Sequence, residues 1–179
     1  EAFAKNIRRL GSSCRAIAID FIWHGLSSAP AVAKGNWLAQ FTDQVVEFMD
    51  REGIEKASFE GESLGGWIAY DMAINHPDRT EKIILNTSWG HTLDPAHVKI
   101  HQSDRTALLQ TSLNALRNPS RDTIRKRLEW LMPRGGTTDE LVELRYAIWS
   151  EEPTRSALIS YYERLWIPET DALLFGEKD

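Results

Sequence analysis

The feature that most constrains the fold is the segment Gly61–Gly65, Gly-Glu-Ser-Leu-Gly, which lies between an apolar stretch and a helix-like stretch. Ala57–Phe59 is short and apolar enough to end a strand, and Gly66–Ile74 carries helical spacing. A serine at such a junction sits on a tight, strained turn with its hydroxyl above the sheet. The sequence therefore predicts a strand–turn–helix corner that presents Ser63.

The residues around this serine favour negative charge at the corner. We expect a side chain at Gly61 or Gly65 to strike the neighbouring strand or helix. The helix that follows points its first N–H groups and its positive dipole end at Ser63. The backbone N–H of Leu64 is then a candidate oxyanion donor. A glycine-rich turn with an inert serine is the alternative interpretation of the pattern alone.

Bulk composition indicates a folded globular protein and argues against several classes of partner. The chain has 179 residues, 42% of them hydrophobic, with a formal net charge of −5, which argues against nucleic acid as the main partner. We interpret the densest basic cluster, Arg121–Arg127, as a solvated helix face. No spacing typical of a metal site, no membrane-length apolar run and no signal-peptide pattern is present. The single cysteine, Cys14, is expected to be buried and suits a reducing compartment, so we expect a cytoplasmic protein.

Alternating strand and helix patterns predict a parallel α/β sheet with right-handed crossovers. The predicted strands are Arg15–Phe21, Lys56–Glu60 and Glu81–Thr87, and the predicted helices cover 2–10, 35–52 and the segment from Ser63 to Asn75. Pro77 ends the last of these helices because the residue before a proline disfavours helical geometry.

From about Asp94 to Trp166 the pattern changes to three or four helices without a strand. Pro119 is expected at a first helical position, Thr137–Glu140 as a capping box, and Pro153 at the start of a further helix. Ala172–Phe175 then returns to strand character. We therefore predict a core over 1–92, an inserted helical cap over 93–167, and a return to the core over 168–179.

Four landmarks in this order resemble those of the α/β-hydrolase superfamily with a helical cap. They are Asp20–Ser27, similar to D-x-x-G-x-G-x-S; Gly61–Gly65, the nucleophile elbow; His76–Arg79, similar to H-P-[ED]-R; and Gly176–Asp179, similar to G-x-x-D. Two positions depart from the family pattern. Trp23 replaces the first glycine of the loop, and Glu62 precedes the serine, where an ionised carboxylate would oppose an oxyanion unless it is paired or points away.

The resemblance implies a Ser–acid–His triad in that chain order. Ser63 matches the nucleophile and Asp179 the acid, with Asp94 as an alternative acid. None of the five histidines is well placed as the base, although His91 is a weak candidate, so we expect the base to lie beyond Asp179 and the chain to be a fragment. The mechanism implied by the family requires no metal and no organic cofactor.

Within the superfamily, the chain is most similar to the meta-cleavage-product hydrolases, which break a C–C bond in 2-hydroxy-6-oxo-dienoates. Ser63–Trp67 and Leu141–Tyr146 carry this likeness. It implies that Arg145 binds the dienoate carboxylate and that Trp149 contacts substrate. A surface role for Arg145 and a packing role for Trp149 remain open. The alternatives are a carboxylesterase and a non-catalytic ligand-binding relative. The expected partner is a small molecule, and self-association into a homo-oligomer stays open.

Overall fold

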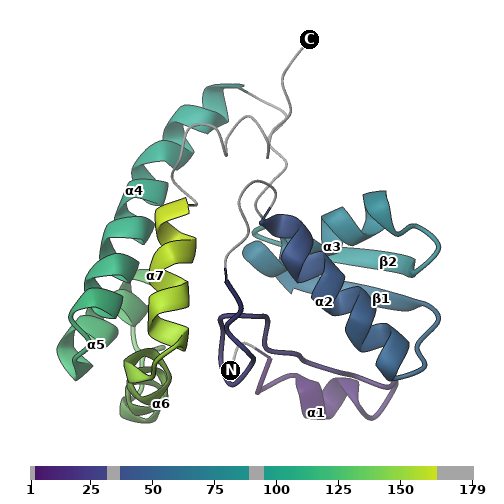
Figure 1. The fold of residues 1–179 in the computed structure, drawn as a ribbon, viewed down its shortest axis with the longest axis horizontal. Coiled ribbons are helices and arrows are strands. Elements are labelled where there is room, and N and C mark those ends of the chain that lie inside the picture. Colours follow the sequence, from purple (N-terminus) through teal and green to yellow (C-terminus); the bar gives the residue numbers. More distant parts are fainter. Residues whose placement is uncertain (1–2, 32–36, 89–94, 165–179) are drawn as a thin grey trace.

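In the computed structural model, the strands and the helices next to them in sequence lie on one side, and the later helices lie on the other (Figure 1). The structure describes residues 3–31, 37–88 and 95–164, with only the backbone described for 95–105. The elements are α1 (Ile7–Leu10), α2 (Leu38–Arg51), β1 (Ala57–Glu62), α3 (Leu64–Asn75), β2 (Thr80–Asn86), α4 (Pro95–Arg117), α5 (Arg121–Leu131), α6 (Asp139–Ser150) and α7 (Thr154–Arg164).

The β1–α3–β2 unit is the part of the fold that positions Ser63. The two strands pair in parallel, with Gly61 opposite Leu85 and Glu62 opposite Asn86. Helix α3 packs on both strands, and α2 packs against α3. The parallel crossover predicted from the sequence is therefore confirmed, and it brings the carboxyl ends of β1 and β2 to the same edge. Helix α3 ends at Asn75, before Pro77, as predicted.

The predicted strand over Arg15–Phe21 is wrong for the described structure. This segment is irregular, and most of its residues are exposed. A strand requires a neighbour to accept and donate its backbone hydrogen bonds, and β1 and β2 pair with each other instead. Cys14, next to this segment, is likewise exposed rather than buried, because its apolar neighbours are not part of the core. The predicted helix over 2–10 is shortened to α1.

Aromatic side chains from α2 and α3 form the centre of the core below the elbow. The rings of Trp37 and Trp67 meet edge to face at a centroid distance of 5.5 Å, and Trp37 and Phe41 meet at 6.0 Å. Met49 and Met72 are fully buried beside them. The helix predicted over 35–52 forms as α2, and its helical spacing of apolar residues places Phe41 and Met49 on the buried side.

Helices α4 to α7, called here the helical block, pack against one another in an array separate from the strands (Figure 1). The prediction of three or four helices after Asp94 is therefore confirmed, with α4 to α7 in the described residues. Trp149, Leu158 and Tyr161 are among the side chains that the block buries. The predicted limits of the cap, 93–167, extend beyond the described residues and remain a prediction.

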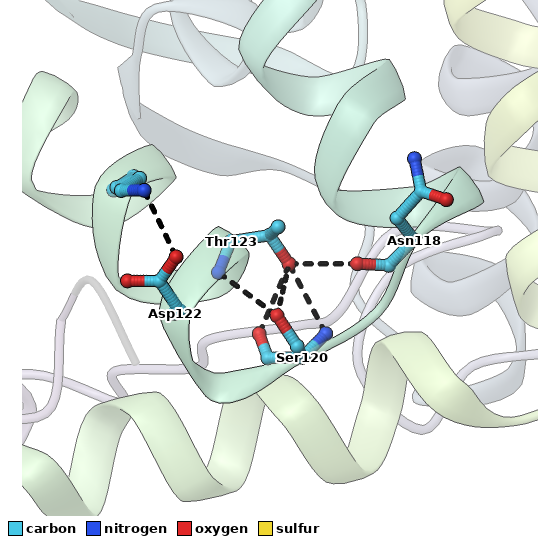
Figure 2. A network of polar contacts seen from close by, with 5 residues as sticks. Asn118, Ser120, Asp122 and Thr123 are labelled. Carbon is cyan, nitrogen blue, oxygen red and sulfur yellow. Dashed lines mark hydrogen bonds and ion pairs between the residues drawn. The ribbon is translucent and has the colours of Figure 1, made fainter.

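The start of α5 shows why the expectation at Pro119 is wrong. Ser120 is the N-cap: its Oγ accepts from the Thr123 N–H at 3.1 Å, and Thr123 Oγ1 accepts from the Ser120 N–H at 3.1 Å (Figure 2). Thr123 Oγ1 also donates to the Asn118 carbonyl oxygen at 2.8 Å. The reciprocal capping box of Ser120 and Thr123 satisfies two backbone N–H groups, and α5 therefore begins at Arg121, two residues after Pro119.

The capping residue of α6 is likewise displaced by one position from the predicted one. Thr138, rather than Thr137, is the N-cap, and its Oγ1 accepts from the Leu141 N–H at 3.2 Å. The Thr137 hydroxyl is buried and has no hydrogen-bond partner among the described residues. Two consecutive threonines offer the same capping chemistry, so the local sequence did not determine which one is used.

Arg79, in the turn after α3, contacts two neighbouring segments of the fold. Its Nε donates to the Glu55 carbonyl oxygen at 2.9 Å, and its Nη2 donates to the Ile54 carbonyl oxygen at 3.0 Å. Nη2 also pairs with Asp50 Oδ1 at 2.7 Å. The guanidinium therefore joins the end of α2 to the loop before β1 and the start of β2.

We expect Arg79→Ala to lower the free energy of unfolding by about 2–3 kcal/mol, because it leaves two backbone carbonyls without their charged donor. The control is Arg51→Ala, which removes an exposed ion pair with Glu47 on α2. It should lower the free energy of unfolding by about 0.5 kcal/mol or less. Urea denaturation measures both. Equal losses in the two variants would show that Arg79 does not hold this turn.

Candidate active site

The backbone at Ser63 has the strained geometry that the sequence predicts for the corner. Ser63 lies directly between β1 and α3, with φ 53° and ψ −112°. A non-glycine residue at positive φ costs about 1–3 kcal/mol and persists only when its surroundings impose it. Here the Ser63 N–H donates to the Asn86 carbonyl oxygen at 3.0 Å, and the Ser63 carbonyl accepts from the Trp67 N–H at 3.2 Å. The end of β2 and the first turn of α3 therefore hold the serine.

The glycines around Ser63 have different roles from those predicted. A Cβ on Gly61 would lie 2.1 Å from the carbonyl carbon of Gly65, so the expectation for Gly61 is confirmed. The expectation for Gly65 is wrong, because a Cβ there would meet nothing closer than Phe21 Cε2 at 4.0 Å. Gly66 is the second crowded position: its Cβ would lie 2.5 Å from the Ser88 side chain. The close approach is thus between β1 and the first turn of α3.

Leu64, the candidate oxyanion donor, is the first residue of α3. The first N–H groups of a helix have no intrahelical acceptor, and the helix dipole is positive at this end. The position of the Leu64 backbone is therefore compatible with the predicted role. Its action on an oxyanion remains a prediction.

Glu62 occupies an exposed position beside the serine. It accepts a hydrogen bond from Thr87 Oγ1 at 3.4 Å. Thr87 follows β2 and itself has a positive φ of 42°. The side chain of Glu62 is therefore exposed to water and directed towards Thr87, after the neighbouring strand. Because water and salt screen exposed charges, its charge has only a weak electrostatic effect at Ser63.

The loop Asp20–Ser27 lies beside the elbow and is held by its own polar groups. Asp20 Oδ2 accepts from the Leu26 N–H at 3.3 Å, and Ser27 Oγ donates to the Asp20 carbonyl oxygen at 2.6 Å. A Cβ on Gly25, which has φ 55°, would lie 2.0 Å from Asp20 Oδ2. These contacts give a physical reason for the aspartate, the second glycine and the serine of the loop pattern.

Trp23 stands at the first glycine of that pattern and keeps a glycine-like backbone, with φ 64°. Its side chain is fully buried, and its Nε1 donates to the Pro30 carbonyl oxygen at 2.6 Å. The ring stacks on Tyr161 of α7 at 5.5 Å. Burial of a large aromatic side chain offsets the backbone strain here. The departure from the family pattern therefore creates a contact between this loop and the helical block.

His24, the next residue, is also directed at the helical block. Its Nδ1–H donates to the Ile22 carbonyl oxygen at 2.9 Å, and its ring lies 6.0 Å from that of Tyr161. Burial lowers the pKa of His24, and the positive charge of Arg145 on α6 lowers it further. A neutral imidazole is therefore favoured, and Arg145 lies close enough to the loop to act on it.

Arg145 and Trp149, the two predicted substrate-binding residues, lie together on α6. The guanidinium carbon of Arg145 is 5.4 Å from the centroid of the Trp149 ring. Trp149 is 5% exposed and belongs to the hydrophobic core. The structure therefore brings this pair together, and gives Trp149 a packing role whether or not it also contacts substrate.

Several sequence predictions concern residues outside the described part of the structure. Asp179, the predicted acid, is among them, as are Asp94, His91 and the predicted strand Ala172–Phe175. Among the residues that are described, no group of three or more potential metal-ligating side chains gathers at one place. In the same part of the chain, no helix has the length and apolar character needed to cross a membrane.

Sequence reasoning missed one buried charge. Arg121 is exposed and Arg125 partly exposed, and both are paired with carboxylates, but Arg127 is only 5% exposed. The signal was present in the helical spacing, because Arg127 lies three residues after Ile124 and next to Leu128, both fully buried. The interpretation of the cluster as a solvated face is therefore wrong for Arg127.

Comparison with known proteins places this fold in a family. Residues 1–177 match the family model described as alpha/beta hydrolase fold. The chain is 34% identical over 143 residues to a 2-hydroxymuconate semialdehyde hydrolase of Pseudomonas sp. strain CF600, covering 76% of this chain and 44% of that protein. It is 33% identical over 107 residues to a putative carbamate hydrolase of Caulobacter sp. strain K31, covering 60% of this chain and 39% of that protein. The chain thus spans less than half the length of these curated relatives.

Solved structures agree on the fold. A meta-cleavage product hydrolase from Pseudomonas fluorescens IP01 superposes with a TM-score of 0.73 at 22% identity, over 99% of this chain and 60% of that one. A 2-hydroxy-6-oxo-6-phenylhexa-2,4-dienoate hydrolase from Rhodococcus sp. strain RHA1 superposes with a TM-score of 0.75 at 21% identity, over 96% of this chain and 59% of that one. With the strained serine corner between β1 and α3, these matches lead to one conclusion: the chain belongs to the alpha/beta hydrolase fold family.

Proposed function

We propose that the whole protein is a serine hydrolase acting on a carbonyl substrate, with Ser63 as nucleophile and Asp179 as the acid of the triad. The single observation that supports this most is the backbone of Ser63, held at positive φ at the start of α3. Strain of this kind is retained where function requires a side chain in a fixed position. At Trp23 the same kind of strain is offset by a fully buried ring, whereas the small side chain of Ser63 provides no comparable burial.

The chemistry follows from the roles. Ser63 Oγ attacks the carbonyl carbon, an imidazole takes the hydroxyl proton, and the Leu64 N–H stabilises the oxyanion. The bond to the leaving group breaks as the imidazole returns the proton to it, and water then hydrolyses the acyl-serine. The two histidines with described side chains do not suit this role: His24 donates to Ile22 and packs on Tyr161, and His76 caps α3. The proposal takes its base from outside the described residues.

We further propose that the bond broken is the C–C bond of a 2-hydroxy-6-oxo-dienoate, with Arg145 binding the substrate carboxylate. The names of the relatives support this substrate class. Arg145 supports it chemically, because a guanidinium matches a carboxylate with two parallel hydrogen bonds. Its position near the Trp23–His24 loop, which packs beside the elbow, is consistent with a substrate lying between core and helical block.

The test is a comparison of substrates with the whole protein. Loss of the yellow dienolate colour reports C–C hydrolysis, and release of nitrophenol from a short nitrophenyl ester reports esterase activity. We expect the dienolate to have the higher kcat/KM. A carboxylesterase would reverse that order, and no turnover of either substrate would contradict the proposal of a hydrolase.

Arg145→Gln should raise KM for the dienolate about tenfold or more, since it removes a charge-assisted pair of hydrogen bonds. Turnover of the uncharged ester should change little. The matched control is Arg121→Gln, which alters an exposed arginine paired with Glu143 on the same helical block and should leave both substrates unaffected. Equal effects of Arg145→Gln on the two substrates would exclude Arg145 as the carboxylate ligand.

A further inference from the structure

The one basic side chain of α5 without a carboxylate partner among the described residues is also the buried one. Arg121 pairs with Glu143, Arg125 with Asp139, and Lys126 with Asp122. Arg127 instead donates through Nε to the hydroxyl of Ser112, a fully buried residue of α4, at 2.7 Å. Its Nη1 is buried and has no hydrogen-bond partner in the described structure.

Among the described residues, side chains from α5, α6 and α7 also act on the Arg127 guanidinium, and none of them carries a negative charge that would neutralise it. Trp130 lies below it, with its ring centroid 5.5 Å from the guanidinium carbon. Burial lowers the pKa of Arg127; Tyr162 of α7 opposes this through its electrostatic interaction and its hydrogen bond, and the charge of Arg145 on α6 lowers the pKa again. The surroundings of Arg127 are thus a hydroxyl, a phenol and an indole, with the charge of Arg145 acting on it from α6.

A buried charge with incomplete hydrogen bonding opposes folding, and a like charge nearby adds to this cost. Such an arrangement gains in free energy when an anion enters its field, because the interior screens charges less than water does. Tyr162, which interacts with Arg127, packs on Tyr161 with ring centroids 5.3 Å apart, and Tyr161 in turn contacts His24 of the core loop at 6.0 Å. Arg145 of α6 interacts electrostatically with both Arg127 and His24. The charge of Arg127 therefore lies close to the side of the helical block that contacts the core.

We propose that the buried charge of Arg127 is a determinant of specificity for anionic ligands, acting together with Arg145 on the side of the helical block that meets the core. The proposal rests on the proposed role of Arg145 as the carboxylate ligand. In it Arg127 does not touch the substrate. Its hydrogen bond to Ser112 fixes the guanidinium in place, and its charge strengthens the binding of a carboxylate at Arg145.

The test separates charge from structure by measuring ligand binding to the whole protein carrying Ser63→Ala, which prevents turnover. The two probes are 2-hydroxy-6-oxohepta-2,4-dienoate and its methyl ester, titrated by calorimetry. Arg127→Gln keeps an amide donor for Ser112 but removes the charge, and should raise the Kd of the carboxylate about tenfold while changing that of the ester less than about twofold. Arg127→Lys keeps the charge and should stay within about threefold for both probes.

Arg125→Met is the matched control, because it alters a partly exposed arginine of the same helix that has its own carboxylate partner, and it should leave both Kd values unchanged. Thermal melting of each variant shows whether it folds, and Arg127→Met, which also removes the charge and carries the same expectation, replaces Arg127→Gln if that variant does not fold. Equal losses for carboxylate and ester in the variant that lacks the charge, or no loss for either, would overturn the inference. Failure of the proposed function would differ: the unsubstituted protein would leave the dienolate intact while still preferring the carboxylate over the ester.

Discussion

Ser63→Ala should lower kcat of the whole protein by at least about 10³-fold, since removing the nucleophile of a triad leaves only the oxyanion donors and substrate binding. The same variant should fold as well as the parent, because the Ser63 side chain makes no cap hydrogen bond to α3. The backbone contacts that hold the corner run through the N–H and carbonyl of residue 63 and survive the change. Steady-state kinetics and thermal melting measure the two effects.

The adjacent Glu62→Gln variant is the control for changes near the corner. Its side chain is exposed and makes one long hydrogen bond to Thr87, so activity should change less than about fivefold. If Ser63→Ala kept more than a tenth of the parent activity, Ser63 would not be the nucleophile. If Glu62→Gln were as inactive as Ser63→Ala, Glu62 would need a catalytic role that its exposure does not suggest.

Gly61→Ala should destabilise the protein by about 3 kcal/mol or more and abolish most of its activity. The new methyl group would lie 2.1 Å from the backbone of Gly65 and 2.4 Å from the Gly66 nitrogen. Backbone atoms cannot rotate away as a flexible side chain can, so β1 and α3 would have to separate. That separation would move Ser63, which lies between them, and a displacement of about 1 Å can cost about 10²-fold in rate.

Gly65→Ala is the matched control, four residues away in the same motif. Its Cβ has open space, with Phe21 Cε2 at 4.0 Å as the nearest atom. Alanine in a helix is favoured over glycine by about 1 kcal/mol, so this variant should be as stable as the parent or slightly more stable. Urea denaturation of the two variants tests the difference. Similar destabilisation by both would mean that the strand and helix are not packed as closely as the structure has them.

The serine corner could be predicted from the sequence because its signals are local. A strand end, a glycine-bounded serine and a helical repeat follow one another within a few residues, and the structure has them in that order as β1, Ser63 and α3. Pro77 likewise stops α3 through a steric effect of adjacent residues. The buried face of α2 was predictable for the same reason, since helical periodicity is a property of one segment.

Features that depend on distant partners were not predictable from local patterns. Arg15–Phe21 has the composition of a buried strand, yet without a paired neighbour it is irregular and exposed. Gly65 looked essential because of its place in the motif, whereas the crowding belongs to Gly61 and Gly66, which approach other elements. Arg127 looked solvated within a run of basic residues, but the packing of four helices buries it. In each case a contact across the fold decides the outcome.

The Trp23 position shows how a departure from a motif can be compensated across the fold. The family pattern places glycine where the backbone has positive φ, and Trp23 keeps that backbone at φ 64°. Its ring is fully buried, because it stacks on Tyr161 and packs edge to face on Phe41 at a centroid distance of 5.1 Å. The sequence alone revealed the departure, and the structure supplies the packing that stabilises it.

The most direct test of the central claim is covalent labelling of the whole protein with a fluorophosphonate, followed by mass spectrometry of its peptides. An activated serine reacts with such a reagent, whereas ordinary serines do not. The account predicts one label per chain, located on Ser63, and loss of labelling when a substrate saturates the site. A protein that stays unlabelled while folded, or that carries its label on another residue, would contradict the assignment of Ser63 as the nucleophile.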